Sequence, residues 1–215
     1  MFRVFVSLLL SAFLMTAPAA AQPVTDSAGK TLQLVAFGDS LSAGYNLSQE
    51  QAFPAVLEKA LRDKGYKVEV INAGVSGDTV QAGLERVDWS VPDGTDGVIL
   101  ELGANDMLRG LDPALTRQGL EQIIERLKAR NIPVMLAGMQ AAPNLGPDYA
   151  AKFNAIYPEL AGKHGLILYP FFLDGIAGNR ILNLPDGVHP TGEGVQLIVD
   201  RILPSVEKFL AGISS

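Results

Sequence analysis

The sequence contains three side chains that could together form an activated serine nucleophile. Ser40 follows a short apolar run, residues 34–37, that ends at Gly38 and is typical of a buried strand. A hydroxyl at the carboxyl end of a buried strand lies where ligands bind in open α/β sheets. Serine is a poor nucleophile unless a base takes its proton and a third group orients that base. His189 can be the base, and Asp186, three positions before it, can orient the ring.

The same residues also have interpretations that involve no catalysis. Asp39 and Ser40 can cap a helix, and Asp186 and His189 can close a loop before the C-terminal helix. The latter pair could also be half a metal site, but the sequence has no zinc-binding spacing such as H-E-x-x-H. We expect neither a metal nor another cofactor. His164 lies in the last turn of a predicted helix, where a cation is favourable, and we interpret it as structural.

Acyl transfer also needs hydrogen-bond donors for the oxygen on which negative charge develops. Asn105 offers a side-chain amide just after the predicted strand 97–102. Gly77 can bring its backbone N–H close to a ligand because it has no side chain, and the N–H of Ser40 at a helix start is a third donor. The carboxyl ends of parallel strands lie along one edge of a sheet, so we expect these groups to converge there.

The composition restricts the class of protein. Of the 215 residues 48% are hydrophobic and 19% are charged, which indicates a globular chain. The net charge of −6 and the absence of a basic cluster argue against a nucleic-acid-binding protein. The sequence contains no cysteine, which excludes disulfides, thiolate metal sites and a cysteine nucleophile.

The N-terminus has the pattern of a signal peptide. Arg3 precedes an apolar stretch, residues 4–15, and residues 19–21 offer a small-residue cleavage site. We expect a signal peptide over 1–21, a flexible lead-in over 22–31 and a single domain over 32–212. The apolar stretch is shorter than the about 20 residues of a membrane span. We therefore expect export to the periplasm or the medium with no stable membrane insertion after cleavage; an uncleaved anchor is the alternative.

Strand and helix patterns alternate along the chain. Strands are predicted at 34–37, 67–71, 97–102, 132–138 and 166–169, and helices at 51–64, 79–87, 111–130, 148–163 and 191–210. Residues 89–96 are predicted as a loop, and Pro204 as an interruption of the last helix. The alternation predicts one α/β domain of about five parallel strands with helices on both faces.

Four separated blocks of this sequence, taken together, resemble those of the SGNH (GDSL) hydrolases. The blocks are Gly38-Asp39-Ser40-Leu41, residues 75–79 around Gly77, residues 103–106 around Asn105, and residues 186–190. Within that superfamily the chain is most similar to the exported bacterial group of thioesterase I, lysophospholipase and arylesterase type.

The resemblance implies a role for each residue already singled out. Ser40 would be the nucleophile, His189 the general base and Asp186 its partner. The N–H groups of Ser40 and Gly77 and the side chain of Asn105 would form the oxyanion hole. The implied fold is a flavodoxin-like three-layer α/β/α sandwich with strand order 2-1-3-4-5.

Two segments predicted as loops, residues 107–111 and 139–146, are expected to shape the acyl-binding side of the site. The resemblance implies that the second of them walls the cleft. The candidates for the acyl-binding wall are apolar residues in or near such segments: Leu108, Leu111, Leu145, Phe171 and Phe172. We interpret the two phenylalanines mainly as packing residues because they directly follow a strand.

We therefore expect a monomeric serine esterase that acts on small-molecule esters through an acyl-enzyme. Aryl esters and esters of short-to-medium acyl chains are the expected substrates, together with thioesters and lysophospholipids. Two alternatives stay open: a carbohydrate O-deacetylase that uses the same site, and an exported binding domain without catalytic activity.

Overall fold

The computed structural model describes residues 30–213. The predicted signal peptide, residues 1–21, and positions 22–29 of the predicted lead-in lie outside the described residues, and the domain limits stay predictions. Within residues 30–213, no helix combines the length and the apolar character that crossing a membrane requires.

The strands form a parallel sheet in the order β2-β1-β3-β4-β5, which confirms the predicted fold class and strand order. Because helices cover both faces, central strands carry near-continuous apolar runs rather than an alternating pattern, and residues 34–37 of β1 are all fully buried. The strands are β1 (Leu32–Gly38), β2 (Val68–Gly74), β3 (Gly97–Glu101), β4 (Val134–Ala137) and β5 (Ile167–Tyr169).

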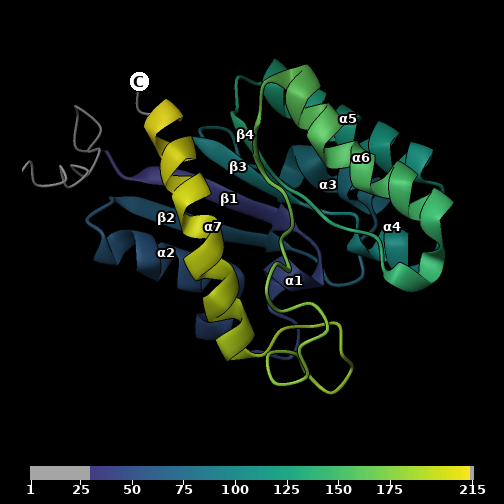
Figure 1. The fold of residues 1–215 in the computed structure, drawn as a ribbon. Helices are drawn as coiled ribbons and strands as arrows, with labels where there is room; N and C mark the ends of the chain where they lie inside the picture. The colour runs from purple at the N-terminus through teal and green to yellow at the C-terminus, as the bar shows by residue number, and fades with distance from the viewer. Residues whose placement is uncertain (1–29, 214–215) are drawn as a thin grey trace, which may run out of the picture.

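Helices cover the two faces of the sheet in separate groups. Helices α2 and α7 pack together on one face, and α3, α5 and α6 lie on the other (Figure 1). The short helices α1 and α4 directly follow β1 and β3 along the chain, at the carboxyl edge of the sheet. The α-helices are α1 (Ser40–Ala43), α2 (Phe53–Asp63), α3 (Val80–Ser90), α4 (Ala104–Leu108), α5 (Pro113–Ala129), α6 (Pro147–His164) and α7 (Gly192–Ile213); the 3₁₀ turns are η1 (Gln49–Gln51) and η2 (Pro143–Leu145).

Three local predictions are wrong. Trp89 and Ser90 belong to α3 and not to a loop, and residues 107 and 108 belong to α4. Pro204 does not interrupt the last helix, because α7 continues through it to Ile213. A proline inside a helix costs about 3 kcal/mol. The long buried face of α7, which includes residues 198, 199, 202, 206, 209 and 210, offsets that cost.

Side chains of α2 cover the outer edge of β2. Glu58 Oε2 accepts the Val70 N–H at 2.8 Å, and Arg62 Nε donates to the Val68 carbonyl at 2.8 Å. The two side chains are also paired with each other at 2.9 Å. The edge strand therefore presents fewer free backbone groups than an uncovered edge would.

The carboxyl end of β2 lies against α1 with no room between them. A Cβ on Gly74 would lie 2.3 Å from the Ala43 nitrogen and 2.8 Å from the Asp39 carbonyl oxygen. These are backbone atoms, so neither can swing away. The glycine thus holds the segment after β2 beside the segment that carries Ser40.

We expect Gly74→Ala to lower the free energy of unfolding by about 1–3 kcal/mol, the usual cost of overpacking. Gly162→Ala is the matched control, because this helical glycine has no atom within 4 Å of an added Cβ. The control should keep or raise stability by about 0.5–1 kcal/mol. Urea unfolding of both variants tests this, and equal stabilities would contradict the close-contact argument.

Candidate active site

Ser40 lies at the first position of α1, two positions after Gly38, the last residue of β1. Asp39 caps this helix, since its Oδ1 accepts the Leu41 N–H at 3.0 Å. The capping interpretation of Asp39 is therefore correct, and it also fixes the direction in which Ser40 leaves the strand. Ser40 is 8% exposed, so its hydroxyl is enclosed but reachable from the surface.

The structure brings Ser40, His189 and Asp186 together in one hydrogen-bonded chain. Ser40 Oγ lies 2.9 Å from His189 Nε2, and His189 Nδ1 lies 2.9 Å from Asp186 Oδ2. An ionised carboxylate only accepts hydrogen bonds, so Nδ1 carries the proton and Nε2 accepts from the serine hydroxyl. Both ring nitrogens of His189 have protein partners, which suits a general base better than a metal ligand.

The Asp186 carboxylate is held by its own loop. Its Oδ1 accepts the backbone N–H groups of Val188 at 2.9 Å and His189 at 3.0 Å. The His189 N–H above all, together with that of Val188, lowers the pKa of Asp186 to about 2. Asp186 is therefore ionised at neutral pH and can stabilise a positive charge on the ring of His189.

Tyr45 packs on the His189 ring, a contact that sequence reasoning missed. The ring centroids are 4.3 Å apart with an interplanar angle of 33°. The tyrosine follows α1 directly, whereas His189 lies on the loop before α7. The sequence around Tyr45 gives no local signal for such a distant partner.

Within residues 30–213, the backbone N–H groups of Ser40 and Gly77 have no protein acceptor; Ser40 lines the cleft described below, whereas Gly77 is exposed and is not among the cleft's lining residues. Gly77 has φ +88°, a conformation that side chains other than hydrogen rarely allow. Its carbonyl accepts from Arg109 Nη2 at 2.8 Å, which ties the β2–α3 loop to the segment after α4. These two donors are available for a ligand.

The Asn105 amide is already bonded on both sides. Its Nδ2 donates to Asp39 Oδ2 at 3.1 Å and to the Asp78 carbonyl at 3.0 Å. Both amide hydrogens therefore have protein acceptors in this structure. A ligand oxygen can receive one of them only by sharing it with, or replacing, one of these two acceptors.

A pair of buried acids underlies the site, and sequence reasoning missed its second member. Glu101, the last residue of β3, is fully buried, and its Oε2 accepts from Ser42 Oγ at 2.8 Å and from the Asp39 N–H at 3.4 Å. Burial, and then the charge of Asp39, raise the pKa of Glu101 well above its usual range. Burial also raises the pKa of Asp39, to about 6. The one sequence signal for a buried acid here is that Glu101 stands alone among apolar residues in the predicted strand 97–102.

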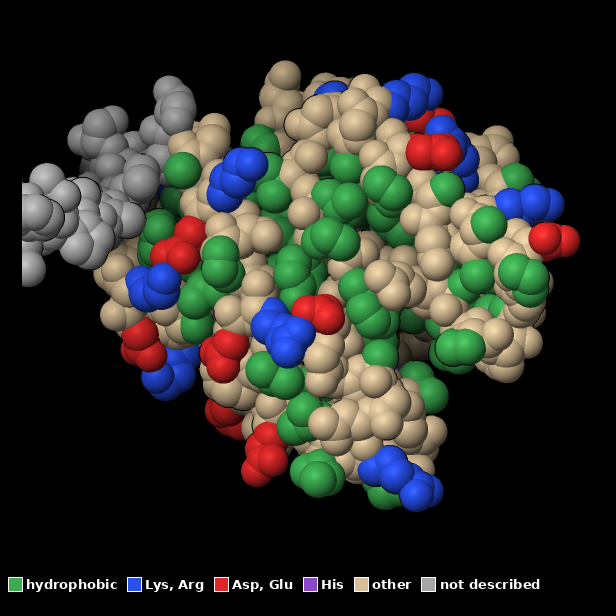
Figure 2. Space-filling model, in the orientation of Figure 1, with side chains coloured by type: hydrophobic (Ala, Val, Ile, Leu, Met, Phe, Trp, Pro, Cys, Tyr) green, Lys and Arg blue, Asp and Glu red, His purple; other side chains and the backbone are tan. Residues whose placement is uncertain are grey.

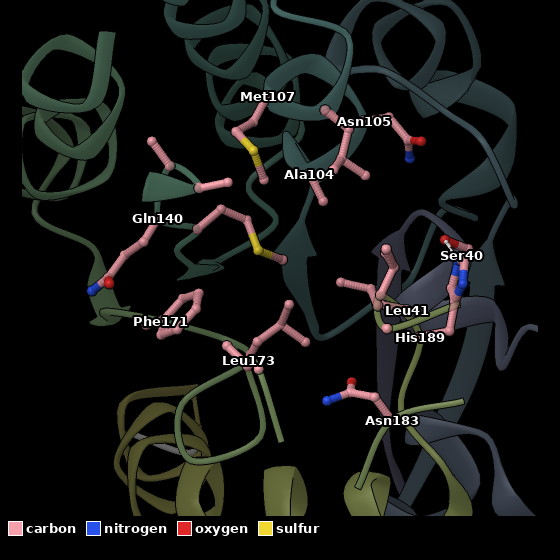
Figure 3. Close-up of a pocket in the computed structure, with 18 of the residues that line it drawn as sticks. Ser40, Leu41, Ala104, Asn105, Met107, Gln140, Phe171, Leu173, Asn183 and His189 are labelled. Carbon is pink, nitrogen blue, oxygen red and sulfur yellow. Dashed lines mark hydrogen bonds between the residues drawn. The ribbon is translucent and has the colours of Figure 1, made fainter. Parts of the chain in front are cut away.

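An apolar cleft of about 420 Å³ extends from this site. Ser40, His189 and Asn105 lie at one end of it, and Gln140 and Phe171 at the other (Figure 3). Figure 2 shows the surface hollowed between the helices at the right of the view and the segment below them. The apolar lining comes mainly from Leu41, Ala104, Met107, Leu108, Met139, Ala141, Ala142, Pro143, Phe171, Leu173, Ala177 and Val188.

Only some of the residues predicted for the acyl-binding wall line the cleft. Leu108 and Phe171 line the cleft, whereas Leu111 and Leu145 are not among its lining residues. Phe172 is fully buried and packs edge-on against Phe53, with ring centroids 4.9 Å apart. The first part of loop 139–146 does line the cleft.

His164 lies at the opposite, amino-terminal edge of the sheet. Its Nε2 is 3.0 Å from Glu121 Oε1, and Lys163 is paired with the same oxygen at 2.6 Å. Within residues 30–213, His164, Glu121 and Glu125 are the group whose ligand atoms approach closely enough for a metal. The ion pairs agree with the structural interpretation of His164.

A serine, a histidine and an aspartate in this order of hydrogen bonds, at the carboxyl edge of a three-layer α/β/α sandwich, define the site type of a serine hydrolase. Comparison with known proteins gives the family. The GDSL-like lipase/acylhydrolase family matches residues 36–197. The chain belongs to this family, and it is an ester-hydrolysing enzyme.

Several relatives span nearly the same length. Esterase TesA of Pseudomonas aeruginosa is 36% identical over 86% of this chain and 91% of its own. Thioesterase 1/protease 1/lysophospholipase L1 of Escherichia coli is 39% identical over 78% of this chain and 79% of its own. The crystal structure of AlinE4, an SGNH-hydrolase family esterase, is 48% identical with a TM-score of 0.71, covering 85% of this chain and 98% of that one.

We expect Glu101→Gln to change how stability depends on pH. The folded-state pKa of Glu101 lies above the unfolded value of about 4.3. This acid therefore stabilises the fold at low pH, and the contribution is lost as pH rises, by at most about 1.4 kcal/mol per pH unit. The free energy of unfolding of the variant, relative to the unmodified protein, should rise from pH 5 to pH 8.

Urea unfolding at the two pH values measures this difference. Glu69→Gln removes the same charge from an exposed position on β2 and is the matched control. A relative stability of Glu101→Gln that stays constant between pH 5 and pH 8 would contradict a raised pKa of Glu101 in the folded protein.

Proposed function

We propose that this protein is an exported, monomeric serine esterase for aryl esters and short-to-medium acyl esters, with Ser40 as nucleophile, His189 as general base and Asp186 as its partner. The observation that carries the proposal is the continuous hydrogen-bonded chain from Ser40 Oγ to Asp186 at the end of an apolar cleft. The signal-peptide pattern of residues 1–21 supports export.

In the first half of the reaction, His189 Nε2 takes the hydroxyl proton while Ser40 Oγ attacks the ester carbonyl carbon. The ring becomes positively charged, and the ionised Asp186 stabilises it. When the tetrahedral intermediate collapses, His189 gives its proton to the departing alcohol or thiol. Water, activated by the same ring, then releases the acid from the acyl-enzyme.

The oxyanion would be held by the N–H groups of Ser40 and Gly77, with the Asn105 amide as the third donor. Because both amide hydrogens of Asn105 are already bonded, we infer that the oxyanion takes over or shares the hydrogen now bonded to the Asp78 carbonyl. The bond to the Asp39 carboxylate is charge-assisted and stronger, so it would keep the amide in place during that exchange.

The cleft supports acyl chains longer than acetyl. Its volume lies within the 300–1,000 Å³ range of ligand pockets, and its lining is mostly apolar. Each CH₂ buried there contributes about 0.8 kcal/mol. The printed names of the relatives, an esterase and a thioesterase/lysophospholipase, support thioesters and lysophospholipids as further substrates.

Ser40→Ala and His189→Ala should each lower kcat by at least about 10³-fold without loss of the fold, and the double variant should lose hardly more, because the two residues act as one unit. Steady-state kinetics on an aryl butyrate, with circular dichroism as the control for folding, measures this. A fluorophosphonate probe should label the unmodified protein at Ser40. Absence of labelling would overturn the assignment of Ser40 as the nucleophile.

The value of kcat/KM should rise with acyl length over the first few carbons and then flatten, because the apolar lining is limited. Leaving groups should be widely tolerated. The measurement is a matrix of acyl lengths against aryl, alkyl and thioester leaving groups. A sharp optimum at acetyl, with butyryl and hexanoyl esters at least about tenfold worse (about 1.4 kcal/mol), would instead support the carbohydrate O-deacetylase.

A further inference from the structure

Arg86, on the sheet-facing side of α3, is a buried arginine that the mechanism above does not use. It is 6% exposed, and its guanidinium carbon lies 4.1 Å from the centre of the Phe37 ring. A buried cation is costly unless it is paired and hydrogen-bonded. Its partners therefore show what the fold gains from it.

One partner, Ser90 Oγ at 3.2 Å, lies on α3 itself, and two others are backbone carbonyls at the carboxyl ends of strands beside the site. Nη2 donates to the Gly38 carbonyl at 2.8 Å, and Nη1 donates to the Ala73 carbonyl at 2.9 Å. Gly38 is the last residue of β1, two positions before Ser40, and Ala73 lies near the end of β2. One guanidinium thus fixes the ends of two neighbouring strands relative to each other.

The remaining partner, Asp78, is in the loop that carries Gly77. Arg86 Nε donates to Asp78 Oδ2 at 2.6 Å, and both side chains of this ion pair are largely buried. The Asp78 carbonyl in turn accepts from Asn105 Nδ2 at 3.0 Å. The Arg86–Asp78 pair therefore connects three segments. Arg86 bonds to the Gly38 carbonyl two positions before Ser40, Asp78 directly follows Gly77, and the Asp78 carbonyl bonds to Asn105.

We propose that Arg86 is a positioning residue for the oxyanion hole, which it assembles by tying the ends of β1 and β2 to the Gly77 loop through Asp78. This inference rests on the proposed function, in which Ser40, Gly77 and Asn105 supply the three donors. Arg86 itself makes no contact with substrate in that mechanism. Its planar fork lets one side chain serve four acceptors at fixed angles, which the single ammonium of lysine does not reproduce.

A loop that is misplaced by a fraction of an ångström affects the transition state more than the bound ester, because the oxyanion donors must meet a charge that exists only there. Arg86→Lys and Arg86→Met should therefore lower kcat by about 10–100-fold. KM should stay within about threefold, because acyl contacts in the cleft are untouched.

Arg126→Met is the matched control. Arg126 donates to the Leu84 carbonyl at 3.2 Å and to Asp88 at 3.1 Å, so it also joins a backbone carbonyl and an aspartate of α3. It does so at the surface, away from the strand ends. Its kcat should stay within about twofold of the unmodified enzyme.

Inhibition separates positioning from a general loss of packing. A hexyl trifluoromethyl ketone forms a tetrahedral adduct with the serine and needs the oxyanion donors, whereas 1-hexanol needs only the apolar cleft. In the Arg86 variants the affinity for the ketone should fall in proportion to kcat/KM, and that for hexanol should not change. Equal losses for both inhibitors, or a folded Arg86→Lys variant with kcat within twofold, would overturn the inference.

Two further variants keep the outcome readable. Asp78→Asn breaks the same ion pair and should give the same kcat loss. It replaces Arg86→Met as the test if that variant does not fold. Asn105→Ala tests the oxyanion hole itself, with an expected loss of about 10²–10³-fold in kcat. If Asn105→Ala lowers kcat and the folded Arg86 variants do not, the Arg86 inference alone fails. If Asn105→Ala has no effect on kcat, the proposed oxyanion hole fails, and the Arg86 inference fails together with it.

Discussion

The hydrogen bond from Asn105 Nδ2 to Asp39 Oδ2 joins the segment after β3 to the segment after β1, and the site geometry depends on it. Parallel strands lose their hydrogen-bonding partners where they end, so the following residues must be held by side chains. Asp39 does this with one carboxylate, which caps α1 through the Leu41 N–H and receives the Asn105 amide. The direction of Ser40 and the position of Asn105 are set by the same residue.

Buried polar groups extend this arrangement to the helices behind the site. Asp106 Oδ2 accepts the Val80 N–H at the start of α3, and its Oδ1 accepts from Thr116 in α5. Burial raises the pKa of Asp106. A core of apolar residues would be cheaper in free energy than these charges. Their directional bonds instead fix the loops between strand and helix, where apolar packing alone would leave several arrangements of similar energy.

The sequence predicts most of the fold because the signals of the fold are local: apolar runs indicate strands, and apolar residues at helical spacing indicate helices. The grouping of Ser40 with His189 follows from the rarity of histidine, which occurs only twice in the sequence, and from the common edge of a parallel sheet. Arg86, Tyr45 and Glu101 could not be predicted in the same way. Their partners are distant in the chain, as with Gly38, 48 positions from Arg86, and no periodicity records such pairs. The full commitment of the Asn105 amide is likewise visible only in three dimensions.

The covered edge of β2 has a consequence for behaviour at high concentration. Parallel sheets form from distant segments, so their strands pair late and their edges are exposed during folding. An open edge can add a strand from another copy and start aggregation. Glu58 and Arg62 occupy the outward Val70 N–H and Val68 carbonyl from within the same chain. A strand from another copy would have to displace both side chains before it could pair along this edge, which makes such pairing less favourable on the side of the sheet beside α2.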